Sequence, residues 1–281
     1  MTLTDLHKKA PQSIDAELEQ NYIFEQELKR SHRRWSVKVV TTRVAITVTI
    51  LAAWQFLSGP VIDEFWLSTP TAIFGRLFEW VADGTLWGHA SATLTAMALG
   101  FVVGSTLGII SGFFLGRNKF FAAVFQPFII GMNSLPKLAL APLFILWFGI
   151  GLESKVLMTG LVVFFLVFYN TYAGARDTDQ ELLDVVTILG ASRRARLLKV
   201  IIPSTATWIF IGLRLAVPYS LIGAVISEIT ASSEGLGYLL KRSANTFDTA
   251  GTFAAIGVLV IVALILNIAV TKAEAVNARW K

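Results

Sequence analysis

The sequence predicts an all-α integral membrane protein with six transmembrane helices. Its 281 residues have a mean hydropathy of +0.64, and only 15% of them are charged, against about a quarter in soluble domains. Several windows of about 18 or more residues are almost free of charge, as is typical of membrane-spanning helices. We expect six spans: Val39–Leu57, Ser91–Leu115, Phe121–Phe148, Val156–Ala173, Thr205–Ile229 and Phe253–Val270.

The positive charges indicate how these spans are oriented in the membrane. With six spans, 18 of the 24 lysines and arginines lie on the side that holds both termini. Positive residues concentrate on the cytoplasmic side of membrane proteins. We therefore expect both termini in the cytoplasm, with a cytoplasmic tail over residues 1–37 and a transmembrane domain over residues 38–281. The tail is polar and is not a cleavable signal, and either a short helix over Ile14–Leu28 or a solvated chain fits it.

The chain lacks the residue patterns of an enzyme or a nucleotide-binding protein. It has no cysteine, and its three histidines are too scattered to form a metal site. It has no Gly-Lys dipeptide and therefore no phosphate-binding loop, and it has neither a zinc motif nor a nucleophile–base pairing. We expect no catalytic residue, metal or cofactor, so energy would come from a partner or an ion gradient. The net charge of +5 follows from topology and does not indicate nucleic-acid binding.

Between the first two spans, Asp63–Gly84 carries a row of aromatic and aliphatic residues. Ile73, Leu77, Trp80 and Val81 have the spacing of one helical face. Tryptophan is enriched at membrane–water boundaries. We expect an interfacial helix that lies on the outer surface of the membrane.

Glycines recur every four residues through the second span. Gly100, Gly104, Gly108 and Gly112 would form a stripe along one face of a helix. Small residues allow neighbouring helices to approach closely within a membrane. The stripe predicts a tight helix contact and requires no ligand.

The third span contains Pro127, Pro136 and Pro142, and Lys137 lies beside one of these breaks. Backbone groups freed by proline are tolerated where they line a cavity or pack against protein. A charge inside a span is costly and usually functional. Lys137 attracts an anionic substrate, or is a structural lysine bonded to carbonyl groups or to Glu228, or snorkels to a membrane interface. The candidate residues of a substrate path are Asn133, Ser134, Lys137, Tyr169 and Asn170.

One polar island, Arg176–Pro203, interrupts the apolar sequence. Gly190 suits a left-handed helix stop, and Ser192 can cap a second helix. The first half has apolar residues at helical spacing: Leu182, Val185, Val186 and Leu189. We expect a helix, a tight turn and a second helix lying across the inner membrane surface. From composition alone, the island contacts either anionic lipid headgroups or a cytoplasmic partner.

The island resembles the coupling loop of binding-protein-dependent ABC importer permeases. That family has the pattern Glu-Ala-Ala-x3-Gly-x9-Ile-x-Leu-Pro, and this chain has Asp184-Val-Val-x3-Gly190-x9-Val200-x-Ile202-Pro203. Gly190 and Pro203 match directly, whereas Asp184 replaces Glu and two valines replace the alanines. Further segments resemble the branch that imports nitrate, sulfonates or taurine: Leu135–Pro142, Leu146–Gly151, Asn170–Gly174, Gly212–Ala216 and Gly235–Tyr238.

This resemblance implies a methionine-importer-like (type I ABC importer) permease fold in a bacterial inner membrane. It implies a transport subunit whose partner chains, cytoplasmic ABC ATPase subunits, hydrolyse ATP. It also implies a second permease copy, as in a homodimer, and a periplasmic or lipid-anchored substrate-binding protein. The implied coupling residues are Asp184, Val185, Val186, Leu189, Gly190, Ala191, Ser192 and Pro203. The alternatives are a secondary transporter driven by an ion gradient, or an ABC permease for another small solute such as a pyrimidine-type precursor.

Overall fold

The computed structural model describes residue 35, residues 37–177 and residues 180–277, which fall into two units divided between Asp63 and Glu64. The tail segment Ile14–Leu28 and Asp179 lie outside the described residues. The first unit contains one apolar helix, Val37–Leu57. A tight turn follows it, in which the Gly59 N–H donates to the Ile62 carbonyl oxygen at 2.7 Å.

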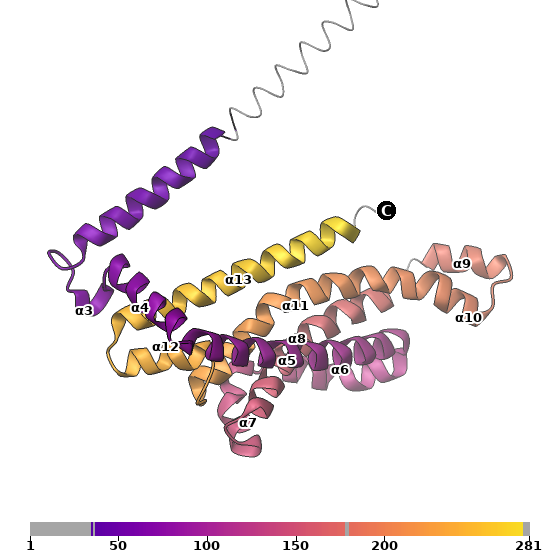
Figure 1. Cartoon of the computed structure of the whole chain (residues 1–281). Coiled ribbons are helices and arrows are strands. Elements are labelled where there is room, and N and C mark those ends of the chain that lie inside the picture. Colours follow the sequence, from indigo (N-terminus) through magenta and orange to yellow (C-terminus); the bar gives the residue numbers. More distant parts are fainter. Residues whose placement is uncertain (1–34, 36, 178–179, 278–281) are drawn as a thin grey trace, which may run out of the picture. The chain divides into compact units, whose positions relative to one another are not determined.

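The second unit is helical, and its described residues contain no β-strand (Figure 1). One short element is a 3-10 helix, η1, and another is a π-helix, η2. The elements are α3 (Glu64–Leu67), α4 (Pro70–Ala82), α5 (Thr85–Arg117), α6 (Lys119–Ser134), η1 (Lys137–Leu140), α7 (Ala141–Phe148), α8 (Leu152–Arg176), α9 (Gln180–Ile188), α10 (Arg193–Arg196), η2 (Leu197–Ile201), α11 (Ile202–Thr230), α12 (Leu236–Asn245) and α13 (Thr249–Asn277).

The predicted apolar windows are helical. Among the described residues, five helices are long and apolar enough to cross a membrane: Val37–Leu57, α5, α8, the continuous helix Arg193–Thr230, and Thr249–Lys272 within α13. The pair α6 and η1–α7 makes a sixth if it forms one span, and it is bent by 84°. Pro127 lies inside α6, whereas Pro136 and Pro142 stand at the starts of η1 and α7. Pro136 therefore lies at the break, whereas Pro142 lies beyond it, at the junction of η1 and α7.

Helices α5, α8 and α11 pack side by side and form the centre of the second unit (Figure 1). Val163, Val167 and Ala216 are buried between them. A Cβ atom at Gly104 would lie 2.4 Å from the Gly160 carbonyl oxygen, so a larger residue would force the two helices apart. The other glycines of the stripe also lie against α8, and the predicted tight contact is confirmed.

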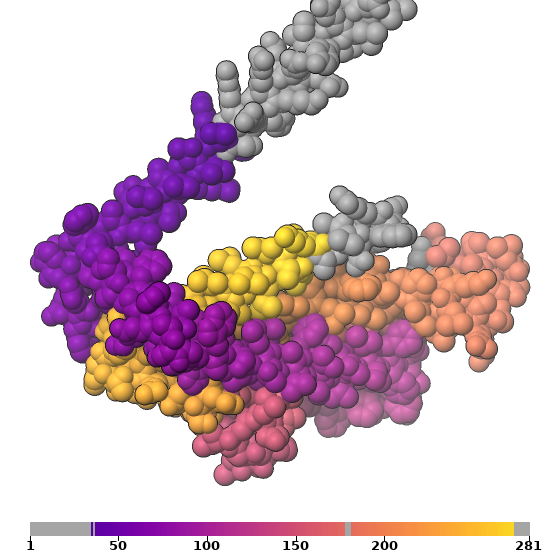
Figure 2. All heavy atoms as spheres, in the orientation of Figure 1, coloured from indigo at the N-terminus to yellow at the C-terminus, as the bar shows by residue number. Residues whose placement is uncertain are grey.

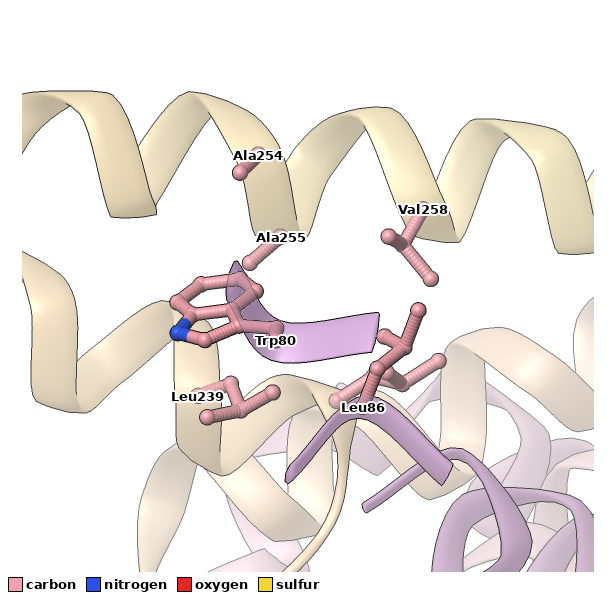
Figure 3. Close-up of a cluster of buried hydrophobic side chains, with 7 residues drawn as sticks. Trp80, Leu86, Leu239, Ala254, Ala255 and Val258 are labelled. Atoms are coloured by element: carbon pink, nitrogen blue, oxygen red, sulfur yellow. The ribbon is translucent and has the colours of Figure 1, made fainter. Parts of the chain in front are cut away.

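Helix α4 is present where an interfacial helix was expected, but its environment differs. Trp80 is buried in a cluster with Leu239 of α12 and Ala255 of α13 (Figure 3). Phe74 and Phe78, on another face of α4, are exposed. Ile73 and Leu77 pack against the same cluster, so the predicted apolar face of α4 packs mostly on protein, and of its four residues only Val81 is exposed.

The second half of the island also differs from the expectation. Helix α10 continues through η2 into α11 and gives one helix from Arg193 to Thr230, rather than a separate helix across the membrane surface. Pro203 cannot donate the hydrogen bond that would continue an α-helix, and its ring crowds the preceding turn. The wider π turn, in which the Ile202 N–H bonds to the Leu197 carbonyl oxygen, comes directly before this proline and lets the helix continue.

Candidate functional site

The α9–α10 hairpin (Gln180–Arg196) contains the predicted turn. Gly190 has a φ of +80°, which favours glycine. The N–H groups of Gly190 and Ala191 donate to carbonyl oxygens three and five residues back, both at 3.0 Å, and so close the end of α9. The Ser192 hydroxyl accepts from the N–H three residues on at 3.2 Å and caps α10. The predicted glycine stop and serine cap are confirmed.

The two faces of α9 differ in burial. Leu183 and Val186 face inward and pack in a cluster with residues of η2. Ile188 and Leu189 remain 85% and 79% exposed at the tip of the hairpin, which stands at one end of the long helices (Figure 2). The other exposed apolar residues of this face are Leu182 and Val185. Ile188, the most exposed of the four, was not among the predicted coupling residues, although its position next to Leu189 could have indicated it.

The Lys137 hollow, of about 570 Å³, is enclosed by η1, α8 and α11 together with the end of α6. Four of the five candidate path residues line it: Asn133, Lys137, Tyr169 and Asn170. Ser134 does not, and its hydroxyl donates to the Ile130 carbonyl oxygen at 2.8 Å. Two further aromatic residues line the hollow, Phe165 and Tyr219, and neither was predicted from the sequence.

Lys137 is held by groups close to it in the chain. Its Nζ donates to the Asn133 carbonyl oxygen at 3.2 Å and to Asn133 Oδ1 at 2.9 Å. It also lies 4.8 Å from the centre of the Phe165 ring, within the range of a cation–π interaction. No acidic residue is found among the described residues that line the hollow. Lys137 Nζ is thus positioned by Asn133 and the Phe165 ring, with no described carboxylate in the lining of the hollow.

A second polar site, the Glu228 cluster, consists of Thr93, Lys155, Glu228 and the backbone of residues 235–237. Glu228 and Thr93 are fully buried, and Lys155 is 2% exposed. Thr93 Oγ1 lies 2.9 Å from both carboxylate oxygens of Glu228, and the Gly237 N–H donates to Oε2 at 2.9 Å. The Lys155 ammonium lies 3.8 Å from Glu228 Oε1. The carboxylate is therefore solvated by protein groups from α5, α8 and α12.

The same cluster fixes the connection between α11 and α12. Lys155 Nζ donates to the Glu234 carbonyl oxygen at 2.8 Å, and the Gly235 N–H donates to His89 Nδ1 at 3.0 Å. Gly235 has a φ of +117°, and a Cβ atom there would lie 2.1 Å from Glu228 Cδ. Lys155 was expected in a loop from the sequence. It lies instead in the first turn of α8, where the Glu228 and Glu234 carboxylates and the Glu234 carbonyl oxygen compensate its charge.

The fold and these sites define the class of the protein: an all-helical membrane protein with a lysine-bearing hollow and a protruding hairpin. The sequence profile of the family described as "Binding-protein-dependent transport system inner membrane component" matches residues 104–276. The formylaminopyrimidine transport permease protein ThiX of Halalkalibacterium halodurans is 30% identical over 83% of this chain and 92% of its own length. The taurine transport system permease protein TauC of Escherichia coli is 29% identical over 85% of this chain and 90% of its own length.

A solved structure supports the fold. The inward-facing MetNI methionine ABC transporter matches 68% of this chain and 96% of its own chain with a TM-score of 0.56 at 14% identity. The chain belongs to the family of inner-membrane components of binding-protein-dependent transport systems. It has the methionine-importer-like permease fold predicted from the sequence.

Proposed function

We propose that this chain is the permease subunit of an ATP-driven importer and that the α9–α10 hairpin docks into a cytoplasmic ATPase subunit, which hydrolyses the ATP. The observation that carries the proposal is the exposed apolar tip of the hairpin beside Gly190. Exposed apolar patches mark surfaces that bind a partner. Because the hairpin continues through η2 into α11, movement at the tip would be passed to a membrane span.

The proposed docking residues fall into two groups, those that would contact the ATPase and those that maintain the shape of the hairpin. Asp184, Val185, Leu189 and Ala191 would contact the ATPase, and we add Ile188 because of its exposure. Val186 packs inward, and Gly190, Ser192 and Pro203 shape the hairpin, so these four would act through its geometry. A change at Val186 would alter the hairpin itself as well as docking.

The proposed assembly has two copies of this chain, two ATPase subunits and a substrate-binding protein on the opposite side of the membrane. The family description, which names a binding-protein-dependent system, supports the last of these partners. The excess of lysine and arginine supports a cytoplasmic location for both termini and for the hairpin. Many apolar side chains of α5, α6 and α11 are exposed in the single chain, as expected for surfaces that meet lipid or the second copy.

For the solute, we propose a small anion that passes through the Lys137 hollow. The ammonium faces a space with two asparagines and no described carboxylate, and a charge in this position attracts the opposite charge. TauC is named a taurine permease, and taurine carries a sulfonate group. A pyrimidine-type solute is the second candidate, because Tyr169 and Tyr219 line the hollow and are aromatic rings against which a planar heterocycle could stack.

The experiment reconstitutes the chain in liposomes with the ATPase and the binding protein encoded beside its gene. Uptake of labelled taurine and of formylaminopyrimidine is measured with ATP, and then with ionophores that collapse ion gradients. ATP-dependent uptake that resists ionophores is expected, whereas uptake that needs the gradient and no ATPase would establish the secondary-transporter alternative.

Lys137→Ala tests the path within the same assay. Uptake of the anion should fall about tenfold or more, as expected for the loss of a charge-assisted contact, while ATPase assembly is retained. Lys119→Ala, which removes a charge at the exposed start of α6 outside the hollow, is the matched control. Equal uptake by wild type and Lys137→Ala would refute the role of this lysine.

A further inference from the structure

A smaller hollow lies where the hairpin joins the membrane helices. Its volume is about 360 Å³, and it is bounded by the end of α5, by α9, by α10 and by η2. Arg117, Arg193 and Arg196 line it together with three apolar residues. Two of the apolar lining residues, Leu183 and Ile201, are buried, so the hollow combines a basic and an apolar lining.

The three arginines lack carboxylate partners in the described part of the chain. No described carboxylate oxygen lies within 4.0 Å of their nitrogens. Arg117 donates one long hydrogen bond of 3.4 Å to the Ala175 carbonyl oxygen, and Arg196 donates one of 2.9 Å to Thr187 Oγ1. Each guanidinium has five N–H donors. Most of these donors are therefore available, and the three arginines that carry them line one hollow.

We propose that Arg117, Arg193 and Arg196 form an oxyanion-binding site that takes a phosphate-type group. The planar guanidinium matches phosphate oxygens in paired hydrogen bonds and is the side chain best suited to this recognition. A bound oxyanion neutralises the mutual repulsion of the three charges. Two sources offer this chemistry at the end of membrane spans, the headgroup phosphate of an anionic lipid and a soluble phosphate or sulfate ion.

The location gives the site a consequence for coupling, which rests on the proposed function of the hairpin. Arg117 ends α5, whereas Arg193 and Arg196 belong to α10, so one oxyanion would connect a membrane span to the base of the hairpin. The π-helical η2 begins at the next residue, and π turns within helices often occur at functional sites. Binding would therefore stiffen the hairpin at the point where it passes motion to α11.

The test measures the melting temperature of the full chain in nanodiscs, with and without the ATPase. Phosphatidylcholine nanodiscs are compared with nanodiscs that also contain phosphatidylglycerol, and with phosphatidylcholine nanodiscs in added inorganic phosphate. A rise with phosphatidylglycerol alone identifies the lipid headgroup as the source, and a rise with inorganic phosphate identifies a soluble oxyanion. No rise in the wild type under either condition would overturn the site.

Arg193→Gln and Arg194→Gln form a matched pair, because they are neighbouring exposed arginines and only Arg193 lines the hollow. Arg193→Gln should weaken the binding of phosphatidylglycerol or inorganic phosphate about tenfold, as expected for the loss of a charged hydrogen-bond donor. Arg194→Gln should leave this binding unchanged. Arg117→Gln repeats the test from α5 if the hairpin variant does not fold.

Equal losses in the matched pair would indicate diffuse surface charge and overturn the proposal. The proposal would also be overturned if Arg193→Gln weakened only the binding of the ATPase, because an acidic side chain of the ATPase would then be the partner of these arginines. Because the assay measures stability of the chain itself, failure of the uptake assay would not affect its outcome.

Discussion

The Glu228 cluster and the α9–α10 hairpin use burial in opposite ways. In the cluster, charged and polar side chains are withdrawn from solvent, and each is bonded to a protein group from another helix or from the connection between α11 and α12. At the hairpin tip, Ile188 and Leu189 are apolar and almost fully exposed. Both regions depend on a glycine with positive φ, Gly235 in the cluster and Gly190 in the hairpin.

The surroundings of these two glycines show the difference most clearly. At Gly235 the space of a side chain is already filled by the Glu228 carboxylate, whereas at Gly190 nothing lies within 4 Å of the position that a Cβ atom would occupy. A region that excludes even a methyl group has one packed arrangement. A region with open space around its turn has a surface left for another molecule. Substitutions should therefore affect folding in the cluster and association at the hairpin.

The largest loss of stability is expected from Gly235→Ala. The new methyl group would overlap Glu228 and the backbone would be held at an unfavourable φ, so the loss should exceed about 4 kcal/mol, the range of severe core changes. The measurement is thermal unfolding of the purified chain in detergent. Gly84→Ala is the control, because Gly84 has a φ of +82° but open space around it. Similar losses in both variants would mean that backbone strain, and not the packing of the cluster, dominates.

The next largest effect is expected from the ion pair inside the cluster. Lys155→Met leaves the buried Glu228 carboxylate without its counter-charge, and such a loss typically costs roughly 3–5 kcal/mol. Glu228→Gln should cost less, because the more exposed Glu234 carboxylate also lies 3.8 Å from the Lys155 ammonium. The double variant removes both charges and should be more stable than the sum of the two single losses predicts. Unfolding measurements on the four proteins give the coupling. Strict additivity would show that Lys155 and Glu228 act independently across their 3.8 Å separation.

A smaller effect on stability is expected from Gly190→Ala. With open space at this position, only the left-handed backbone is unfavourable, which costs about 1–2 kcal/mol for a residue with a Cβ atom. Gly190→Asn should recover part of this loss, because asparagine tolerates the left-handed region. Unfolding curves of the two variants against wild type provide the comparison. A loss at Gly190→Ala as large as that at Gly235→Ala would remove the distinction between the two regions.

The sequence predicted features that depend on local patterns. Apolar windows indicated the helices, Gly190 and Ser192 indicated the hairpin turn, and the glycines from Gly100 to Gly112 indicated the contact between α5 and α8. Their signals lie within a few residues of each other, where helix periodicity and turn chemistry act.

The sequence did not reveal features that depend on distant partners. Thr93 and Glu228 are 135 positions apart, and nothing near either residue indicates the other. From the sequence Lys155 was expected in a loop, because its counter-charge, Glu228, is distant in the chain. From the sequence Trp80 was expected at the membrane interface, because nothing near it in the chain indicates that α12 and α13 cover it. Four path residues were found to share a hollow, but the role of that hollow in transport remains a proposal.

The most direct test of docking at the hairpin is co-purification of the ATPase with Ile188→Glu. The side chain is 85% exposed, so a charge should change the stability of the chain by no more than about 0.5 kcal/mol. It would nevertheless place a charge in an apolar contact, and association with the ATPase should be lost. Ile188→Met, which keeps an apolar side chain, should retain it. Normal co-purification of the ATPase with Ile188→Glu, at unchanged melting temperature, would contradict the role of the hairpin as the docking element.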